Sequence, residues 1–119
     1  MEATGTSLDL LFRMMSASTE RARVISSNIA NVDTPGYRRS DVRFEDLLRD
    51  ASQSGRTDLS NITPRIEEDT LTPANADGNN VTLELELNAS RQNRLLYETY
   101  AAIMQTHFEM LRAGIESGR

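Results

Sequence analysis

The chain has 119 residues, enough for one small hydrophobic core but not for a second of useful size. Hydrophobic residues make up 38% of it and aromatic residues 5%, so material for a compact interior is scarce. The net charge of −5 argues against non-specific binding of nucleic acid, which requires clustered cations. Cysteine is absent, which excludes disulfides, zinc–thiolate sites and thiol chemistry.

The stretch from about residue 7 to residue 33 has the pattern of a long amphipathic helix. Alternating steps of three and four residues join eight positions, seven of them apolar: Leu8, Leu11, Met15, Ser18, Ala22, Ile25, Ile29 and Val32. This spacing is typical of a helix that packs along a seam against another helix. Thr6 and Asp9 resemble a weak capping box at its start. Pro35 and Gly36 predict its end, because the residue before a proline avoids the α region and glycine permits a positive φ.

Residues from about 34 to 78 show no sustained period. The segment Val42 to Leu48 has enough amphipathic character for a turn or two of helix, and the residues after it are rich in Ser, Thr, Asp, Asn and Pro. Such a composition buries too little apolar area to offset the entropy of ordering the chain. The sequence therefore predicts a polar, irregular middle segment, mobile in the isolated chain and ordered, if at all, against a partner.

A second long helix is predicted from about residue 80 to residue 116. One apolar stripe consists of Tyr97, Ala101, Met104, Phe108, Leu111 and Ile115. A second stripe beside it consists of Leu96, Tyr100, Ile103, His107 and Met110. So wide an apolar face indicates burial on two sides. The opening residues Val81 to Leu87 alternate like a strand, but Glu and Leu favour helix and no turn separates them from the rest of the stretch.

Together these elements predict an all-α fold: an antiparallel hairpin of long N- and C-terminal helices with a coiled-coil-like core, joined by the irregular middle segment. No stretch approaches the roughly 18 apolar residues that indicate a membrane-spanning helix. The N-terminal residues lack the basic region, apolar run and cleavage site of a Sec-type signal peptide. If the protein works outside the cytoplasm, we expect another route to carry it there.

The chain offers little for catalysis or for binding a metal or cofactor. His107 is the single histidine and lies on the second apolar stripe, so we expect it to be packed or partly exposed. The acidic run Glu67-Glu68-Asp69 lacks the ligand spacing and the glycine of a calcium loop. The sequence therefore predicts no enzymatic activity, no cofactor, no metal site, no small-molecule substrate and no nucleic-acid partner.

The strongest signal is SNIANVDTPGY, residues Ser27 to Tyr37, which closely resembles the N-terminal signature of bacterial flagellar rod, hook and hook-associated axial proteins. The segment Arg39 to Leu48, RSDVRFEDLL, resembles the continuation found in the proximal-rod protein of the B type. The run Asp77 to Val81, DGNNV, resembles that family's approach to its C-terminal helix. In the helix itself the pairs Asn93 with Tyr97 and Leu111 with Ile115 also match.

These resemblances come one after another along nearly the whole chain, and only the loop from about 50 to 70 is featureless. The first signature is shared by all axial proteins, so the later blocks and the short length carry the B-type assignment. Ser40 and Arg43 stand where other residues are usual, and the loop is short.

The resemblance implies a single axial-protein domain over residues 1–119 that serves as a structural subunit of the proximal rod of the flagellar basal body. Such subunits pack in a helical tube that transmits torque and conducts export. The implied partners are other rod proteins, the MS-ring and export-gate base, adjacent axial proteins and further copies of the chain. The implied location spans the periplasm, after export by the flagellar type III apparatus without a cleaved signal.

Two alternatives stay open on the sequence. One is the C-type proximal rod protein, which usually has a longer chain and a different C-terminal helix motif. The other is an acidic helical-hairpin adaptor or chaperone, which would share the seams but has no reason to contain NIANVDTPGY.

Subunit contacts are predicted at the corner where the first helix ends and along the second helix. At the corner we expect Asn28, Asn31, Asp33 and Thr34 to expose donors and acceptors, with the Pro35–Gly36 turn pointing Tyr37 outward. The full set of candidate interface residues is Asn28, Asn31, Asp33, Thr34, Pro35, Gly36, Tyr37, Phe44, Asn80, Asn93, Tyr97, Met104, Phe108, Leu111 and Ile115.

Overall fold

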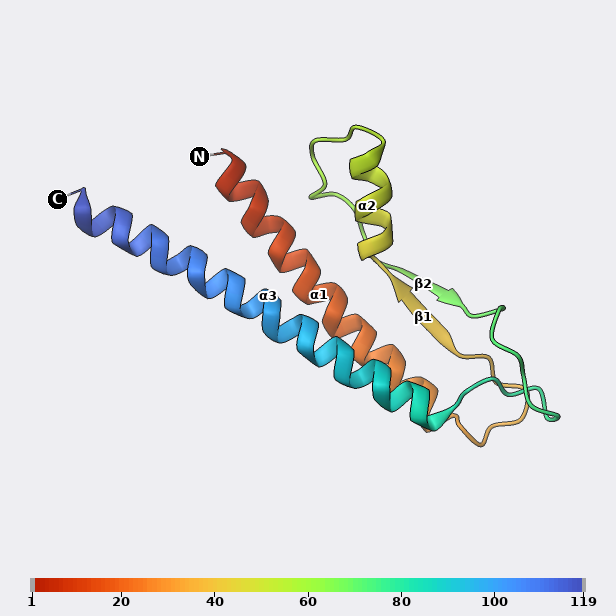
Figure 1. The fold of residues 1–119 in the computed structure, drawn as a ribbon. Helices are drawn as coiled ribbons and strands as arrows, with labels where there is room; N and C mark the ends of the chain where they lie inside the picture. The colour runs from red at the N-terminus through yellow and green to blue at the C-terminus, as the bar shows by residue number, and fades with distance from the viewer. Residues whose placement is uncertain (1, 119) are drawn as a thin grey trace.

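A computed structural model describes residues 2–118 as a long hairpin with a folded middle segment along one side (Figure 1). The two long helices are α1, Glu2–Ala30, and α3, Leu83–Ser117, which run antiparallel and bring the chain ends to the same end of the molecule. Between them come β1, Ser40–Arg43; α2, Glu45–Gln53; and β2, Arg65–Glu68. The molecule measures 67 × 29 × 15 Å.

The prediction of two long terminal helices packed together is confirmed, with shifted boundaries. The helix α1 runs through Thr6 and Asp9, so these residues do not mark its start, and it ends at Ala30. The helix α3 begins at Leu83, after Thr82 in an extended conformation (φ −117°, ψ 117°). Most of the alternating stretch 81–87 is therefore helical, as its helix-forming residues predict.

The prediction of an irregular middle segment is wrong where β1 and β2 form, and all-α is only an approximate description of the fold; the short helix expected near residues 42–48 is present as α2. The strands β1 and β2 pair antiparallel, with Ser40 opposite Glu68 and Arg43 opposite Arg65. The order comes from a small apolar cluster that the sequence does place in this segment. Phe44 and Leu48 are buried with Ala17 of α1, and partly buried apolar side chains surround them: Leu10, Met14, Leu59 and Ile62.

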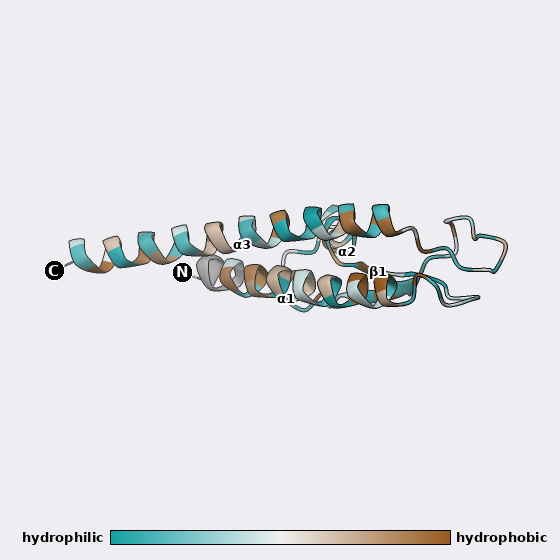
Figure 2. Cartoon of the chain, turned by 90° about the horizontal axis from the view of Figure 1, so that it is seen from below, coloured by the Kyte–Doolittle hydropathy of each residue, from teal (hydrophilic) through white to brown (hydrophobic). Residues whose placement is uncertain are grey.

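The helix α1 contacts both α3 and the middle segment (Figure 1), and α3 also contacts the middle segment directly, through Tyr100 with Glu45. Ala17 packs into the cluster with Phe44, whereas the next residue, Ser18, bonds Asn93 of α3. Figure 2 shows apolar residues recurring along both long helices, and α3 extends past the N-terminal end of α1. Among residues 2–118, no helix has both the length and the hydropathy that crossing a membrane would require.

Candidate functional site: the hairpin corner

Two glycine turns meet where the hairpin reverses, and we call this region, residues 28–40 with 69–86, the corner. Gly36 and Gly78 have φ values of +74° and +88°, a backbone region that side chains with a Cβ rarely adopt. The Gly36 N–H donates to the carbonyl of Asp77 at 2.8 Å. A Cβ on Gly78 would lie 3.2 Å from the Gly36 Cα. Glycine at position 78 is thus favoured both by its positive φ and by the close approach of the two turns, whereas at position 36 it is favoured by the positive φ alone, because a Cβ there would meet nothing within 4 Å.

The buried side chain of Asn79 completes the C-terminal end of α1. Its Nδ2 donates to the carbonyl oxygens of Asn31 at 2.9 Å, Val32 at 3.1 Å and Thr34 at 2.8 Å. These acceptors lie just past Ala30, the last residue of α1, and two of them also accept backbone N–H groups, Asn31 from Thr34 and Thr34 from Tyr37. Its Oδ1 accepts the N–H of Val81 at 2.7 Å, just before α3 begins. One side chain thereby joins the end of α1 to the start of α3.

Asn28 is fully buried and connects α1, β1 and α3. Its amide pairs with the backbone of Ser40 in both directions, accepting at 3.0 Å and donating at 2.9 Å. The Tyr37 hydroxyl donates to Asn28 Oδ1 at 3.3 Å, and Asn28 Nδ2 donates to Glu86 Oε2 at 3.3 Å. Only a carboxamide supplies both donors and acceptors for this set of partners.

Arg39 is the ionic centre of the corner. Its guanidinium contacts carboxylate oxygens of Glu86 at 2.5 Å, Asp69 at 2.8 Å and Asp41 at 2.8 Å. Burial disfavours the charge on Arg39, but its hydrogen bonds to the three carboxylates raise its pKa above the ordinary value. Hydrogen bonds from Thr72, together with Arg39, hold the pKa of Asp69 well below its usual range. The Glu86 side chain is 1% exposed, so Arg39 provides the positive charge that a buried carboxylate requires.

An open groove of about 410 Å³ is lined mainly by α1, β1 and the start of α2, with Ala89 of α3. Three arginines line it, and each is already paired with carboxylates: Arg21 with Glu45, Arg39 with its three partners in the corner, and Arg43 with Glu67 and Asp46. Among the described residues 2–118, His, Asp and Glu form no cluster of three or more suited to a metal ion. The chemistry of the corner is therefore mutual neutralisation and hydrogen bonding within the chain.

The candidate interface residues divide by exposure. Buried inside the chain are Asn28, Phe44, Asn80, Asn93 and Met104. Half-buried are Asn31 and Tyr37. Exposed are Asp33, Thr34, Pro35, Gly36, Tyr97, Phe108, Leu111 and Ile115.

The expectation that Asn28 exposes its amide and that Tyr37 points outward is wrong, because both side chains bond within the corner. Asn80 is likewise occupied, accepting the Arg39 N–H at 2.7 Å and donating to the Asp69 carbonyl at 3.0 Å. For the exposed residues, a role in subunit contact remains a prediction.

Sequence reasoning missed Arg39, Asp69 and Glu86 as members of the corner. Arg39 and Glu86 are 47 residues apart, and a pair at that separation leaves no periodic signal. Glu86 offered a weak hint, because it is a charged residue among leucines at the start of a helix with a wide apolar face. A role for Asn79 could have been predicted, because the residue belongs to the DGNNV run that resembles the rod family.

Comparison with known proteins finds a family that matches the signature and relatives that match most of the chain. Residues 15–38 match the family described as "Flagella basal body rod protein", so the match covers the end of α1 and the first corner turn. Three similar relatives are each called "Flagellar basal body rod protein FlgB". The protein of Borrelia hermsii is 32% identical, over 92% of this chain and 96% of its own. That of Aeromonas hydrophila is 31% identical over 77% and 79%, and that of Bacillus subtilis 30% identical over 88% and 89%.

The class defined by the fold and these likenesses is that of the structural, non-enzymatic proteins of the flagellar rod. The chain belongs to the flagellar basal body rod protein family, and its relatives there are FlgB proteins. It is accordingly a structural subunit of the flagellar rod, located in the basal body and assembled with other rod and basal-body components.

Proposed function

We propose that the whole chain, residues 1–119, acts as a single axial domain in the proximal part of the rod. Copies of it pack with one another and with adjacent axial proteins in a helical tube that transmits torque and conducts export. Its further partners are the MS-ring and export-gate base, and the assembled subunit lies across the periplasm. A helical tube requires heterologous contacts, in which one surface patch meets a different patch on the next subunit.

The observation that supports this proposal is the apolar surface that α3 leaves uncovered. Phe108, Leu111 and Ile115 are 49%, 42% and 65% exposed, although they share one helix face at steps of three and four residues. Exposed apolar surface of this kind marks a protein interaction site. The exposed tip of the corner, Asp33 to Gly36, offers a second and polar contact.

Export through the flagellar type III apparatus, without a cleaved signal, fits the thin core of the monomer. The cluster of Ala17, Phe44 and Leu48 is small for a chain of this length. A small core gives a low free energy of unfolding, which eases passage of the chain through a narrow channel.

The test is complementation of a strain that lacks its own rod protein of this type. The parent chain should restore motility and fractionate with hook–basal bodies. A Phe108→Ser/Leu111→Ser variant should lose both, with little change in the melting temperature of the purified monomer, because both side chains are half exposed. Leu71→Ser, at a residue that is 92% exposed and outside the helices, is the matched control and should still complement. Restored motility with the double variant would refute the proposal that the exposed apolar face of α3 takes part in rod assembly.

A further inference from the structure

The helix α3 turns three side chains that carry hydrogen-bonding groups toward the rest of the chain: a carboxylate, a carboxamide and a phenol. Glu86, Asn93 and Tyr100, here called the polar line, are spaced seven residues apart and so lie on one side of the helix. They are only 1%, 5% and 6% exposed, and the remaining buried residue of α3 is Met104. An amphipathic helix normally buries its apolar side, so this inward face needs an explanation.

Asn93 supplies the middle contact of the polar line. The Ser18 hydroxyl donates to Asn93 Oδ1 at 2.9 Å, and Asn93 Nδ2 donates to the Ser18 carbonyl at 2.7 Å. Arg21, one turn further along α1, donates to the same Oδ1 at 3.2 Å. Both hydrogen-bonding ends of the carboxamide are satisfied only while this side of α3 faces α1.

Tyr100 and Glu86 make equally directional contacts on either side of Asn93. The Tyr100 hydroxyl donates to Glu45 Oε2 at 2.9 Å at the start of α2, and Glu45 also pairs with Arg21 at 2.6 Å. Burial, with the hydrogen bond to Glu45, raises the pKa of Tyr100 to about 12, so the hydroxyl keeps its proton as a donor. Glu86 is held by Asn28 and Arg39 in the corner.

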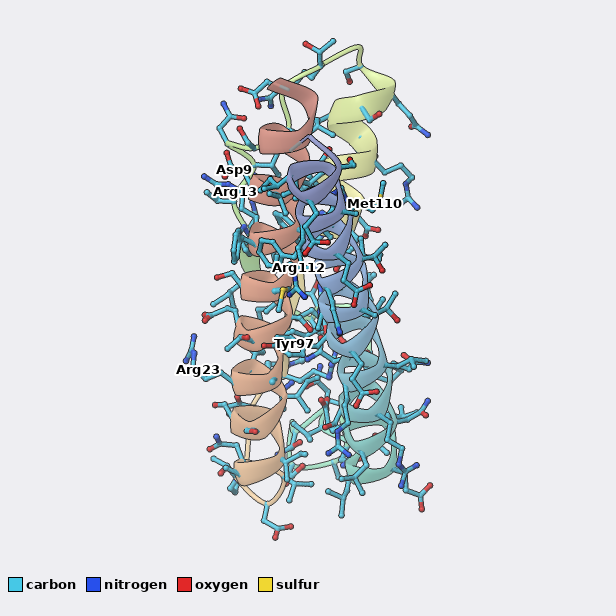
Figure 3. The ribbon with its side chains drawn as sticks, turned by 90° about the vertical axis from the view of Figure 1, so that its left-hand side faces the viewer. Asp9, Arg13, Arg23, Tyr97, Met110 and Arg112 are labelled. Atoms are coloured by element: carbon cyan, nitrogen blue, oxygen red, sulfur yellow. The ribbon has the colours of Figure 1, made fainter. Side chains whose placement is uncertain are left out.

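A competing apolar side of α3 remains outside. Leu85, Leu96, Ile103 and Met110, here called the apolar flank, are 62%, 38%, 43% and 67% exposed. Leu85 precedes Glu86 by one position, and Ile103 follows Tyr100 by three, which places the flank roughly 60–100° around the helix from the polar line. In Figure 3, Arg23 reaches outward from α1 while Met110 lies on the opposite side of the hairpin. Hydrophobicity alone would favour turning this flank inward.

We propose that the polar line is the orientation determinant of α3: its hydrogen bonds fix the rotation of the helix about its axis and keep the apolar flank on the surface of the subunit. Buried polar pairs act in this way because leaving a buried donor or acceptor without a partner costs more than the pair contributes when made. That the flank then serves in assembly rests on the proposed function. The orientation itself rests only on contacts within one chain.

The absence of cysteine from the sequence makes a direct test available. Single cysteines are introduced as reporters at Ile103, which is 43% exposed, and in a separate chain at Met104, which is 8% exposed. The rate of modification by a thiol reagent is measured for each purified monomer, and the ratio of the two rates reports which side of α3 faces outward. The parent should show fast reaction at position 103 and slow reaction at position 104.

The decisive variant is Ser18→Ala/Asn93→Leu, which removes both partners of the pair and leaves an apolar contact. The ratio of rates should fall at least about tenfold, because the three hydrogen bonds of the Asn93 side chain no longer select the orientation. Tyr100→Phe, which keeps the ring and loses only the hydroxyl, should lower the ratio about fivefold. The matched control is Gln92→Leu, an amide-to-leucine change at an exposed neighbouring position, which should leave the ratio unchanged.

Circular dichroism of each variant establishes that the hairpin is helical before labelling. If the double variant fails to fold, the labelling ratio of Tyr100→Phe decides the outcome. An unchanged ratio in the folded variants would overturn the proposal, and so would an equal fall in Gln92→Leu. Failure of the proposed function is seen separately, as failure of the parent chain to complement a strain without its rod protein. That result would leave the labelling ratios unaffected.

Discussion

The corner and the last turns of α3 both contain predicted interface residues, yet their surroundings differ in kind. In the corner, Asn28 and Asn80 are buried, and their hydrogen bonds are satisfied within the chain. In the last turns of α3, Phe108 and Ile115 are apolar and half or more exposed. The difference teaches that a distinctive motif need not form an exposed surface. Part of NIANVDTPGY closes the hairpin on itself, whereas an ordinary apolar stripe stays exposed.

The largest effect should come from removing the cation at the centre of the corner. Arg39→Leu leaves Glu86 buried without its charged partner, and we expect a loss of about 3–5 kcal/mol in the free energy of unfolding. Urea denaturation followed by circular dichroism measures it. Arg23→Leu is the control, because Arg23 is 66% exposed and pairs only along α1, so its loss should change little. Equal effects of the two substitutions would contradict the role given to Arg39.

The contact between the two glycine turns should give the next largest effect. Gly78→Ala forces a Cβ against the Gly36 backbone at a positive φ, and we expect a cost of about 1–3 kcal/mol. Gly55→Ala has a similar φ of +90° but open space around the new Cβ. It therefore measures the free-energy cost of placing a side chain at positive φ, without a steric contact. The denaturant concentration at the unfolding midpoint should be clearly lower for Gly78→Ala than for Gly55→Ala. Matching midpoints would show that the close approach of the turns has no energetic role.

Acid should loosen the corner through Asp69, by a smaller amount. Its pKa is lowered in the folded state, so below about pH 4 the unfolded chain binds a proton that the folded chain does not. The stabilisation is complete above the unfolded pKa and declines as the pH falls below it. Thermal melts of the parent at constant ionic strength should therefore decline more steeply from pH 5 to pH 3 than those of Asp69→Asn. If the melting temperatures of the parent and of Asp69→Asn fall equally between pH 5 and pH 3, Asp69 does not contribute to the acid sensitivity.

The smallest effect on the monomer should come from the end of α3. Ile115→Ser changes a residue that is 65% exposed, so we expect the free energy of unfolding to change by no more than about 0.5 kcal/mol. The same substitution at Ile25, which is 5% exposed, should cost about 3 kcal/mol, because it removes buried apolar volume and introduces a hydroxyl. A large loss at Ile115 would show that α3 is packed to its end within the monomer.

Local features of the sequence predicted the two long helices and the turn between Asn31 and Gly36. Spacings of three and four residues, helix-forming residues and a proline–glycine stop act over one or two turns of chain, so they can be read without the fold. The middle segment was misjudged because its order depends on a few apolar anchors. Phe44 and Leu48 are stabilised by Ala17, far earlier in the chain, and not by their polar neighbours.

The candidate site was predicted only in part, for a related reason. Ser18 stood out as the polar exception in the seam of the first helix, and Asn93 was noted as part of a motif, yet nothing in the sequence pairs them across 75 residues. Hydrophobic patterning also favoured burial of both apolar stripes of the second helix. In the structure, Tyr100 and Met104 of these stripes are buried, whereas large apolar residues of both stripes stay exposed, among them Ile103 and Phe108.

The sequence by itself determined the helices, the corner turn and membership of the flagellar rod family, because these depend on local propensity and on motifs contiguous in the chain. The tertiary structure decided which polar groups meet: Asn28 with Glu86, Arg39 with Asp69, and Ser18 with Asn93. It also decided which side of α3 faces inward. The physical reason is that a buried donor or acceptor must find a partner wherever the chain brings one, and that requirement outweighs the non-directional preference to bury apolar surface.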